Sequence, residues 1–318
     1  MNKYITNLLP YIKIARPDHY IKQLFILPGS LVAIILCHIN IQNISLIDFI
    51  VGFFATCLIA SSNYIINEYL DIEHDKFHPI KKNRTLIKLK NKVKLKYIML
   101  EYFGLLLLGL SLSLNISDFL FYTNLLLAIM GIIYNVKPIR SKDIPYIDVL
   151  SESFNMAIRL LIGWFLIVSN YFPPISLILG YWFAGAFLMA VKRFSEYKMI
   201  NDPKQAGLYR KSFKYYTEET LNIQSLFYAM SSIFFVGIFL IKYKIELLLI
   251  IPFLCMLYCY YFKLSFTKDS STQRPEKLFH EKKLLLYILI INIFAVILLL
   301  IKIPALHVLL DNSLIGIK

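Results

Sequence analysis

Three oxygen-bearing side chains recur at every fourth residue near the end of an apolar run, at Asn67, Asp71 and Asp75. On a helix, residues four apart stack on one face with about 6 Å between them, so these side chains would form one stripe. Glu68 lies at the edge of that stripe. Oxygen ligands directed at one point suit Mg²⁺, which commonly joins carboxylates to the phosphates of a substrate. The pattern therefore predicts a magnesium site formed by Asn67, Glu68, Asp71 and Asp75, with Asn67, Asp71 and Asp75 also taking part in catalysis.

Basic residues follow the stripe closely, at His78, Lys81 and Arg84. Cations at these positions can hold the same phosphates as the metal, and arginine can do so through two parallel hydrogen bonds. The alternative is a helix that simply ends at a membrane surface, with its charges in solvent. Solvated charges have no reason to keep a four-residue spacing back into an apolar run, so we favour a functional site for Asn67, Asp71 and Asp75.

A second charged cluster ends a later apolar run with the sequence Lys192-Arg193-Phe194-Ser195-Glu196. The bland explanation is an ion pair on a helix surface, which stabilises a helix by only about 0.2–0.5 kcal/mol. A site formed by the stripe on one helix would, however, need side chains from another helix on its opposite side. One carboxylate and two cations are suitable for the part of a site that binds phosphate groups. We predict that Lys192 and Arg193 bind substrate and that Glu196 belongs to the catalytic set.

Three further cations stand in or beside apolar runs. Arg159 lies well inside one, and charges at such depth usually face the bundle interior, where they are paired or functional. Pairing with Glu152 or Asp148 is the structural alternative. Arg16 and Lys22 flank the start of the first run, where anchoring at the membrane surface is the alternative. We predict that Arg16, Lys22 and Arg159 bind substrate.

Long apolar helices must position these clusters. The chain has 318 residues, of which 58% are hydrophobic, and runs of about 20 apolar residues match a hydrocarbon core of about 30 Å. We predict an all-α, polytopic membrane bundle of about nine transmembrane helices, which forms a single integral-membrane domain over residues 1–318. The predicted segments are 23–41, 46–67, 95–113, 117–136, 145–168, 173–196, 221–241, 246–264 and 283–303.

The net charge of +14 has an uneven distribution. Lysine and arginine concentrate in alternate connections, which by the positive-inside rule places the N-terminus in the cytoplasm and the C-terminus outside. Both charged clusters then face the cytoplasm. Basic loops of this kind face anionic membrane lipid and, in a site, phosphate substrates. No basic stripe with interleaved aromatic residues stands apart from these loops, so we expect no nucleic-acid partner.

The first cluster is similar to the first motif of the UbiA superfamily of intramembrane prenyltransferases. In that motif an Asn and two Asp at four-residue spacing, on the second of nine helices, precede a loop of the form H-P-x-K-x-x-R-P. Thr85 stands where the family usually has the final Pro. The matching residues here are Asn67, Asp71, Asp75, His78, Pro79, Lys81 and Arg84.

The second cluster resembles one branch of that superfamily. Branches that prenylate aromatic rings usually carry two or more Asp there, whereas K-R-F-S-E resembles the K-R-Y-x-E of the decaprenyl-phosphate phosphoribosyltransferase branch. Three other stretches are similar to that branch: Arg16-Pro17 with Lys22; Lys142, Pro145 and Asp148 with Arg159; and Tyr209-Arg210-Lys211 with Tyr216-Thr217 and Leu221.

This resemblance implies a Mg²⁺-dependent transferase in a bacterial inner membrane. A polyprenyl phosphate would attack C1 of 5-phosphoribosyl 1-diphosphate, and diphosphate would leave. The stripe would hold Mg²⁺ on the donor's diphosphate. Lys22, Arg159, Lys192 and Arg193 would hold the phosphates of donor and acceptor, and Glu196 would orient those cations or touch the metal.

Two other functions stay open from the sequence. The nearer one is a UbiA enzyme that joins a prenyl diphosphate to an aromatic ring for quinone or haem biosynthesis, which the shortage of Asp in the second cluster disfavours. The other is a transporter or lipid flippase, which intramembrane charges also suit. Both clusters lie on one side of the membrane, however, and leave no charged path to the other side.

Overall fold

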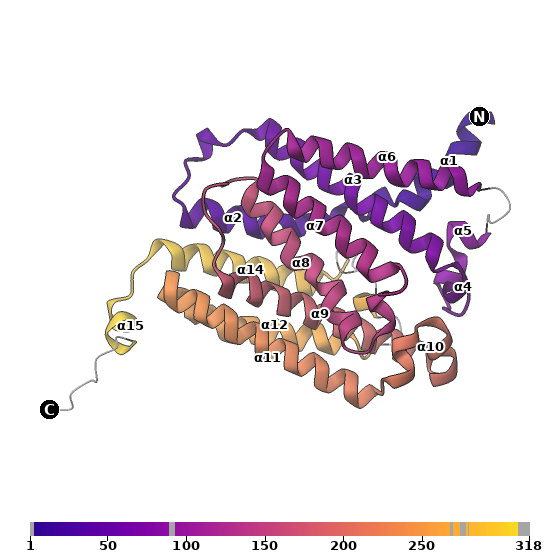
Figure 1. Ribbon diagram of the computed structural model, residues 1–318. Helices are drawn as coiled ribbons and strands as arrows, with labels where there is room; N and C mark the ends of the chain where they lie inside the picture. The colour runs from indigo at the N-terminus through magenta and orange to yellow at the C-terminus, as the bar shows by residue number, and fades with distance from the viewer. Residues whose placement is uncertain (1–2, 89–92, 268–269, 274–277, 279, 311–318) are drawn as a thin grey trace.

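A computed structural model of the chain describes residues 3–88, 93–267, 270–273, 278 and 280–310. Within these residues all regular structure is helical, which confirms the all-α prediction. The long helices lie side by side in one bundle, with α1 (Lys3–Ala15) and α15 (Pro304–Leu309) at opposite ends (Figure 1).

Nine long helical stretches of the described residues match the nine predicted segments. Eight of them have the length and hydropathy to cross a membrane. The ninth, α8, has a similar length of 19 residues but carries more charge. The nine stretches are η1 (Pro17–Ile26) with α2 (Leu27–Leu36), α3 (Leu46–Leu70), α6 (Leu95–Leu114), α7 (Asp118–Asn135), α8 (Ile147–Phe165), α9 (Ile175–Ile200), α11 (Glu218–Tyr243), η6 (Ile245–Ile250) with α12 (Ile251–Leu264), and α14 (Lys282–Leu300).

The first stretch begins earlier than the predicted segment 23–41. Pro17 starts the tight 3₁₀ turns of η1, and Pro28 stands in the first turn of α2, where a missing N–H costs nothing. The apolar helix proper ends at Leu36. Because η1 belongs to the bundle, it carries Lys22 and the fully buried Gln23 inward between the longer helices.

The charged helix α8 lies inside the bundle. It packs against α2, α7 and α9 as well as η1, and its side chains from Ile158 to Phe165 are almost all buried, Arg159 excepted. An interior helix does not face lipid, so its charged side chains can meet partners or a cavity instead. This position explains why the least apolar of the predicted segments is nevertheless a regular helix.

Two apolar clusters flank the middle of the bundle. One joins α3, α7 and α8 through residues such as Ile59, Leu127 and Ile158. The other joins α9, α11 and α12 through Phe187, Tyr228 and Tyr261. The outward faces keep large exposed apolar side chains, such as Leu100, Phe234 and Leu300. Contiguous apolar surface of this extent is unfavourable in water and favourable in lipid.

Helices α2 and α8 approach each other through two glycines. A Cβ added at Gly29 would lie 2.0 Å from the backbone oxygen of Leu160, and one added at Gly163 would lie 2.0 Å from the backbone oxygen of Ile26. The Ser30 hydroxyl donates to the Gly163 carbonyl at 2.8 Å. No flexible side chain can yield here, because both obstacles are backbone atoms.

The replacement Gly163→Ala is therefore expected to lower the free energy of unfolding by about 2 kcal/mol, the usual cost of overpacking. Thermal unfolding of the purified protein in detergent measures this change. Gly104→Ala on α6 is the matched control, since nothing lies within 4 Å of its added Cβ. Equal stability of the two variants would contradict the close helix contact.

Short elements gather at the end of the bundle where α1 lies. They are α4 (Ile72–Asp75), α5 (Thr85–Lys88), α10 (Pro203–Tyr209) and the 3₁₀ turns η3 (Lys81–Asn83), η4 (Ser141–Asp143) and η5 (Lys211–Tyr215). Figure 1 shows α4, α5 and α10 together at this end. Helix α10 contacts both α4, which carries Asp75, and α9, which carries Lys192 to Glu196. It therefore packs over both of the charged clusters that the sequence predicted.

Candidate active site

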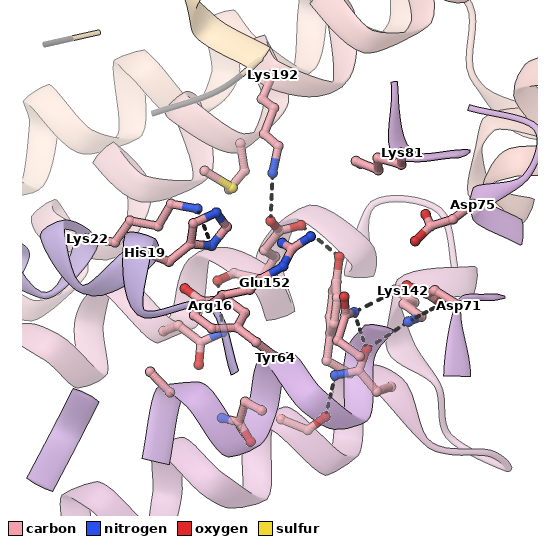
Figure 2. Close-up of a pocket in the computed structure, with 18 of the residues that line it drawn as sticks. Arg16, His19, Lys22, Tyr64, Asp71, Asp75, Lys81, Lys142, Glu152 and Lys192 are labelled. Atoms are coloured by element: carbon pink, nitrogen blue, oxygen red, sulfur yellow. Dashed lines mark hydrogen bonds and ion pairs between the residues drawn. The ribbon is translucent and has the colours of Figure 1, made fainter. Parts of the chain in front are cut away.

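A cavity of about 680 Å³ opens among these elements. It is lined by side chains from η1, α3, α4, η3, α7, η4, α8, α9 and α10, several of which point toward one another in Figure 2. Among the described residues, nine lysines and arginines line it against five aspartates and glutamates. Such a surplus of positive charge favours ligands that carry several negative charges.

The stripe Asn67, Asp71 and Asp75 lies on the cavity wall. Although α3 ends at Leu70, the backbone N–H of Asp71 still donates to Asn67 at 3.1 Å and that of Asp75 to Asp71 at 2.8 Å. The four-residue spacing is thus kept across the junction with α4. The sequence predicted this shared face.

Asp71 is held by cations that the sequence reasoning did not place in the site. Its Oδ1 lies 2.6 Å from Lys142 Nζ and 2.9 Å from Arg140 Nη2, and its Oδ2 accepts from Asn67 Nδ2 at 3.2 Å. Burial alone would raise the pKa of Asp71, but Lys142 and Arg140 lower it. Asp71 is therefore a carboxylate at neutral pH.

The donor set of the stripe fits Mg²⁺. It offers two carboxylates and one amide, all oxygen ligands, in a cavity large enough for the water and phosphate ligands that Mg²⁺ usually retains. In the described part of the chain, no group of three or more His, Cys, Asp and Glu side chains forms a metal site by itself.

Glu68 points elsewhere. It does not line the cavity and is buried, with one carboxylate oxygen accepting from the Leu86 N–H at 3.1 Å and the other 3.4 Å from Arg16 Nε. Asp75 pairs with Arg84 at the cavity wall. The structure thus separates Glu68 from the other three predicted metal ligands, because the edge of the stripe turns toward α1 and α5.

His78 and Lys81 meet under α10. His78 Nδ1 accepts from the N–H groups of Ile80 and Lys81 at 3.1 Å each, and its ring lies 4.6 Å from that of Tyr209. Burial, with the nearby Lys81, lowers the pKa of His78 to about 3, so the ring is neutral. Lys81 donates to Glu196 Oε1 at 2.9 Å and to the Tyr209 hydroxyl, and it lines the cavity while His78 does not.

The second cluster divides between the cavity and the protein interior. Lys192 lines the cavity and lies 3.2 Å from Glu152 Oε1. Arg193 and Glu196 do not line it, and both are buried. The structure therefore does not bring the predicted substrate ligand Arg193 to the cavity surface.

The remaining predicted cations come from η1, with its preceding residue, and from α8. Arg16, Lys22 and Arg159 all line the cavity. Lys22 Nζ lies 2.9 Å from His19 Nδ1, and Figure 2 shows this pair pointing inward from η1. Arg159 Nε donates to Gln23 Oε1 at 2.9 Å and its Nη1 to the Asn155 carbonyl at 3.1 Å. Its partners are thus neutral groups rather than Glu152 or Asp148.

Several cavity residues were missed by the sequence reasoning as site residues. They come from α7, α8, α10 and the turns that follow α7 and α10, and no regular spacing marks them. Lys142, Tyr209 and Arg210 nevertheless fall in stretches that resemble the phosphoribosyltransferase branch. Lys142 is almost fully buried, and burial lowers its pKa to about 8 despite the neighbouring Asp71. The missed residues are Tyr134, Arg140, Lys142, Glu152, Tyr209 and Arg210.

Comparison with known proteins agrees with this architecture. A relative named decaprenyl-phosphate phosphoribosyltransferase, from Corynebacterium glutamicum, is 26% identical over 220 residues, which are 65% of this chain and 59% of the relative's length. The chain thus spans less than two thirds of that relative.

Solved structures of a UbiA homologue from Archaeoglobus fulgidus share the fold. The one bound to GPP and Mg²⁺ has a TM-score of 0.68 at 19% identity, covering 92% of this chain and 100% of that one. The one bound to DMAPP and Mg²⁺ has a TM-score of 0.67 at 18% identity, covering 92% and 99%. The sequence model of the UbiA prenyltransferase family matches residues 26–304. This integral membrane protein therefore belongs to the UbiA prenyltransferase family, as its first motif predicted.

Proposed function

We propose that the protein transfers 5-phosphoribose from phosphoribosyl diphosphate to a polyprenyl phosphate. The observation that carries this proposal is the charge of the cavity, where the described residues place nine lysines and arginines against five acidic side chains. One diphosphate with a bound divalent ion needs only a few of these lysines and arginines to balance its charge. An uncharged aromatic ring as acceptor would need none of the remaining ones. Two phosphorylated reactants account for the surplus, and the relative from Corynebacterium glutamicum bears the matching name.

The cavity offers two groups of cations for two reactants. Lys81, Arg84, Arg140 and Lys142 surround the stripe, so they suit the diphosphate of the donor. Lys22, Lys192 and Arg159 come from η1, α9 and α8, so they suit the phosphate of a lipid acceptor. Arg16 stands beside the first group. Two reactants of like charge repel each other, and fixed cations remove that part of the barrier.

In the proposed reaction, an oxygen of the lipid phosphate forms a bond to C1 of the ribose while the bond from C1 to the diphosphate oxygen breaks. The lipid phosphate is already ionised, so no general base is required. Asn67, Asp71 and Asp75 would hold Mg²⁺, which when bound neutralises the leaving diphosphate. Lys142 and Arg140 would donate hydrogen bonds to that diphosphate as its negative charge grows.

The buried members of the site would act through their neighbours. We assign Glu68 to fixing Arg16 and the Leu86 backbone rather than to the metal. His78 would shape the turn that presents Lys81. Glu196 would orient Lys81 from behind. In this proposal the whole chain works as one domain in a bacterial inner membrane, with its N-terminus and the cavity at the cytoplasmic face.

The test is transfer by the purified, full-length protein with labelled phosphoribosyl diphosphate and decaprenyl or undecaprenyl phosphate. The expected result is a lipid-linked phosphoribose, identified by mass spectrometry and absent with Asp71→Ala. A parallel reaction with a prenyl diphosphate and an aromatic acid serves as the competing assay. A prenylated aromatic product, with no lipid-linked phosphoribose, would overturn the proposal.

A further inference from the structure

Arg193 occupies a position that no contact with substrate explains. It follows Lys192 on α9, but only Lys192 lines the cavity. The Arg193 side chain is 0% exposed, and Arg193 is among the largest fully buried residues of the described chain. Placing a guanidinium in such a position is expensive unless acidic groups surround it.

Three carboxylates surround the Arg193 guanidinium. Nη1 donates to Glu196 Oε2 at 3.2 Å, Nε lies 3.4 Å from Asp148 Oδ2, and Nη2 donates to Glu152 Oε2. Glu196 belongs to α9, and the other two belong to α8. One cation cannot neutralise three carboxylates, so further cations are needed.

Each of these carboxylates also holds a cation that lines the cavity. Glu196 accepts from Lys81 at 2.9 Å through Oε1, and Glu152 accepts from Lys192 at 3.2 Å through Oε1. Asp148 Oδ2 lies 3.7 Å from Arg210 Nη1. The two glutamates thus use one oxygen for Arg193 and the other for a lysine of the cavity (Figure 2 shows the Lys192–Glu152 link).

We infer that Arg193 is a positioning residue that sets three cavity cations, Lys81, Lys192 and Arg210, through three shared carboxylates. These cations come from three separate places, namely η3, α9 and the turn after α10. A common buried partner fixes their positions relative to one another. This inference rests on the proposed function only in requiring that the cavity binds phosphate groups.

Loss of the Arg193 guanidinium changes how each carboxylate holds its other cation. A buried carboxylate that shares its charge between Arg193 and a cavity cation attracts that cation more strongly once the guanidinium is gone. The lysine is then held more strongly to the protein and less well directed at a ligand. Lysine at position 193 keeps the charge but, as a single ammonium group, cannot reach three carboxylates in a planar fork.

The closing experiment measures binding of inorganic diphosphate with Mg²⁺ to the full-length protein in detergent, by calorimetry. We expect Arg193→Lys to weaken binding by about 10- to 100-fold, the size of one lost charged hydrogen bond. We expect Lys192→Gln to weaken it about tenfold. Because Arg193 acts through Lys192, the double variant should lose much less than the product of the two effects.

Arg159→Gln is the matched control for this cycle. Arg159 also lines the cavity, but its hydrogen bonds go to Gln23 and the Asn155 carbonyl rather than to the three carboxylates. Combined with Arg193→Lys, it should show the full product of the separate effects. If the effect of Arg193→Lys on the binding free energy adds equally well to that of Lys192→Gln and to that of Arg159→Gln, the inference is overturned.

A second set of variants leaves Arg193 in place, in case Arg193→Lys unfolds. Glu152→Gln should be non-additive with Lys81→Gln, and Glu196→Gln with Lys192→Gln, because Arg193 connects each glutamate to the glutamate that holds the other lysine. Either glutamate variant should be additive with Arg159→Gln. A purely structural role would weaken binding in every combination alike and would refute the inference. If the wild-type protein does not bind diphosphate with Mg²⁺ at all, both the proposed function and this inference fail. If it binds diphosphate but the effects of all the paired substitutions are additive, only the inference about Arg193 fails.

Discussion

Replacing Asp71 by alanine is expected to lower the rate of transfer by about 10³-fold or more. Asp71 lies at the centre of the stripe and accepts Lys142 and Arg140 on one oxygen and Asn67 on the other. Without it, the proposed metal site loses one of its two carboxylates, and Lys142 and Arg140 lose their common anchor. Initial rates with saturating lipid phosphate measure the loss.

The isosteric change Asp71→Asn separates charge from shape. It should lose nearly as much activity as Asp71→Ala, because an amide keeps the volume but binds a divalent cation weakly. Asp18→Asn is the control, since Asp18 also lines the cavity but its side chain is 70% exposed. Wild-type activity should disappear with EDTA and return with added Mg²⁺. Turnover that survives both Asp71→Ala and EDTA would exclude the assigned site.

The second large effect is expected from Lys142→Met, which keeps most of the side-chain volume and removes the ammonium group. Lys142 Nζ lies 2.6 Å from Asp71 Oδ1 and 2.7 Å from Asn135 Oδ1. The Lys142 side chain lies at the cavity wall and is 5% exposed. Loss of one positioned donor to a developing negative charge usually lowers a rate by about 10²- to 10³-fold. We expect a loss of that size in kcat/KM for the phosphorylated donor.

Lys211→Met provides the comparison for this variant. Lys211 is also a lysine paired with an acidic residue of the cavity wall, 3.3 Å from Asp143, but its side chain is 46% exposed and it does not line the cavity. Its removal should change kcat/KM by less than about threefold, as is usual for an exposed ion pair. Similar losses for the two variants would mean that the net charge of this face matters, rather than the position of Lys142.

The sequence alone determined the class of fold and the first half of the site. Nine apolar stretches require helices in a bilayer, because backbone groups in lipid must be satisfied within their own segment. The spacing of Asn67, Asp71 and Asp75 requires a shared helix face wherever the helix lies. These predictions depend on local geometry and on the membrane, so they did not need the positions of other helices.

Only the tertiary structure decided which charged neighbours reach the cavity. Lys192 and Arg193 are adjacent, and so are Asn67 and Glu68, but in each pair only the first lines the cavity. Adjacent helical residues point about 100° apart, so one faces the cavity and the other faces whatever packs beside it. The sequence does not state what packs there. Arg140 and Lys142 enter the site from a turn between α7 and α8, and Arg210 enters from the turn after α10, so their contribution depends on how distant segments fold over the end of the bundle.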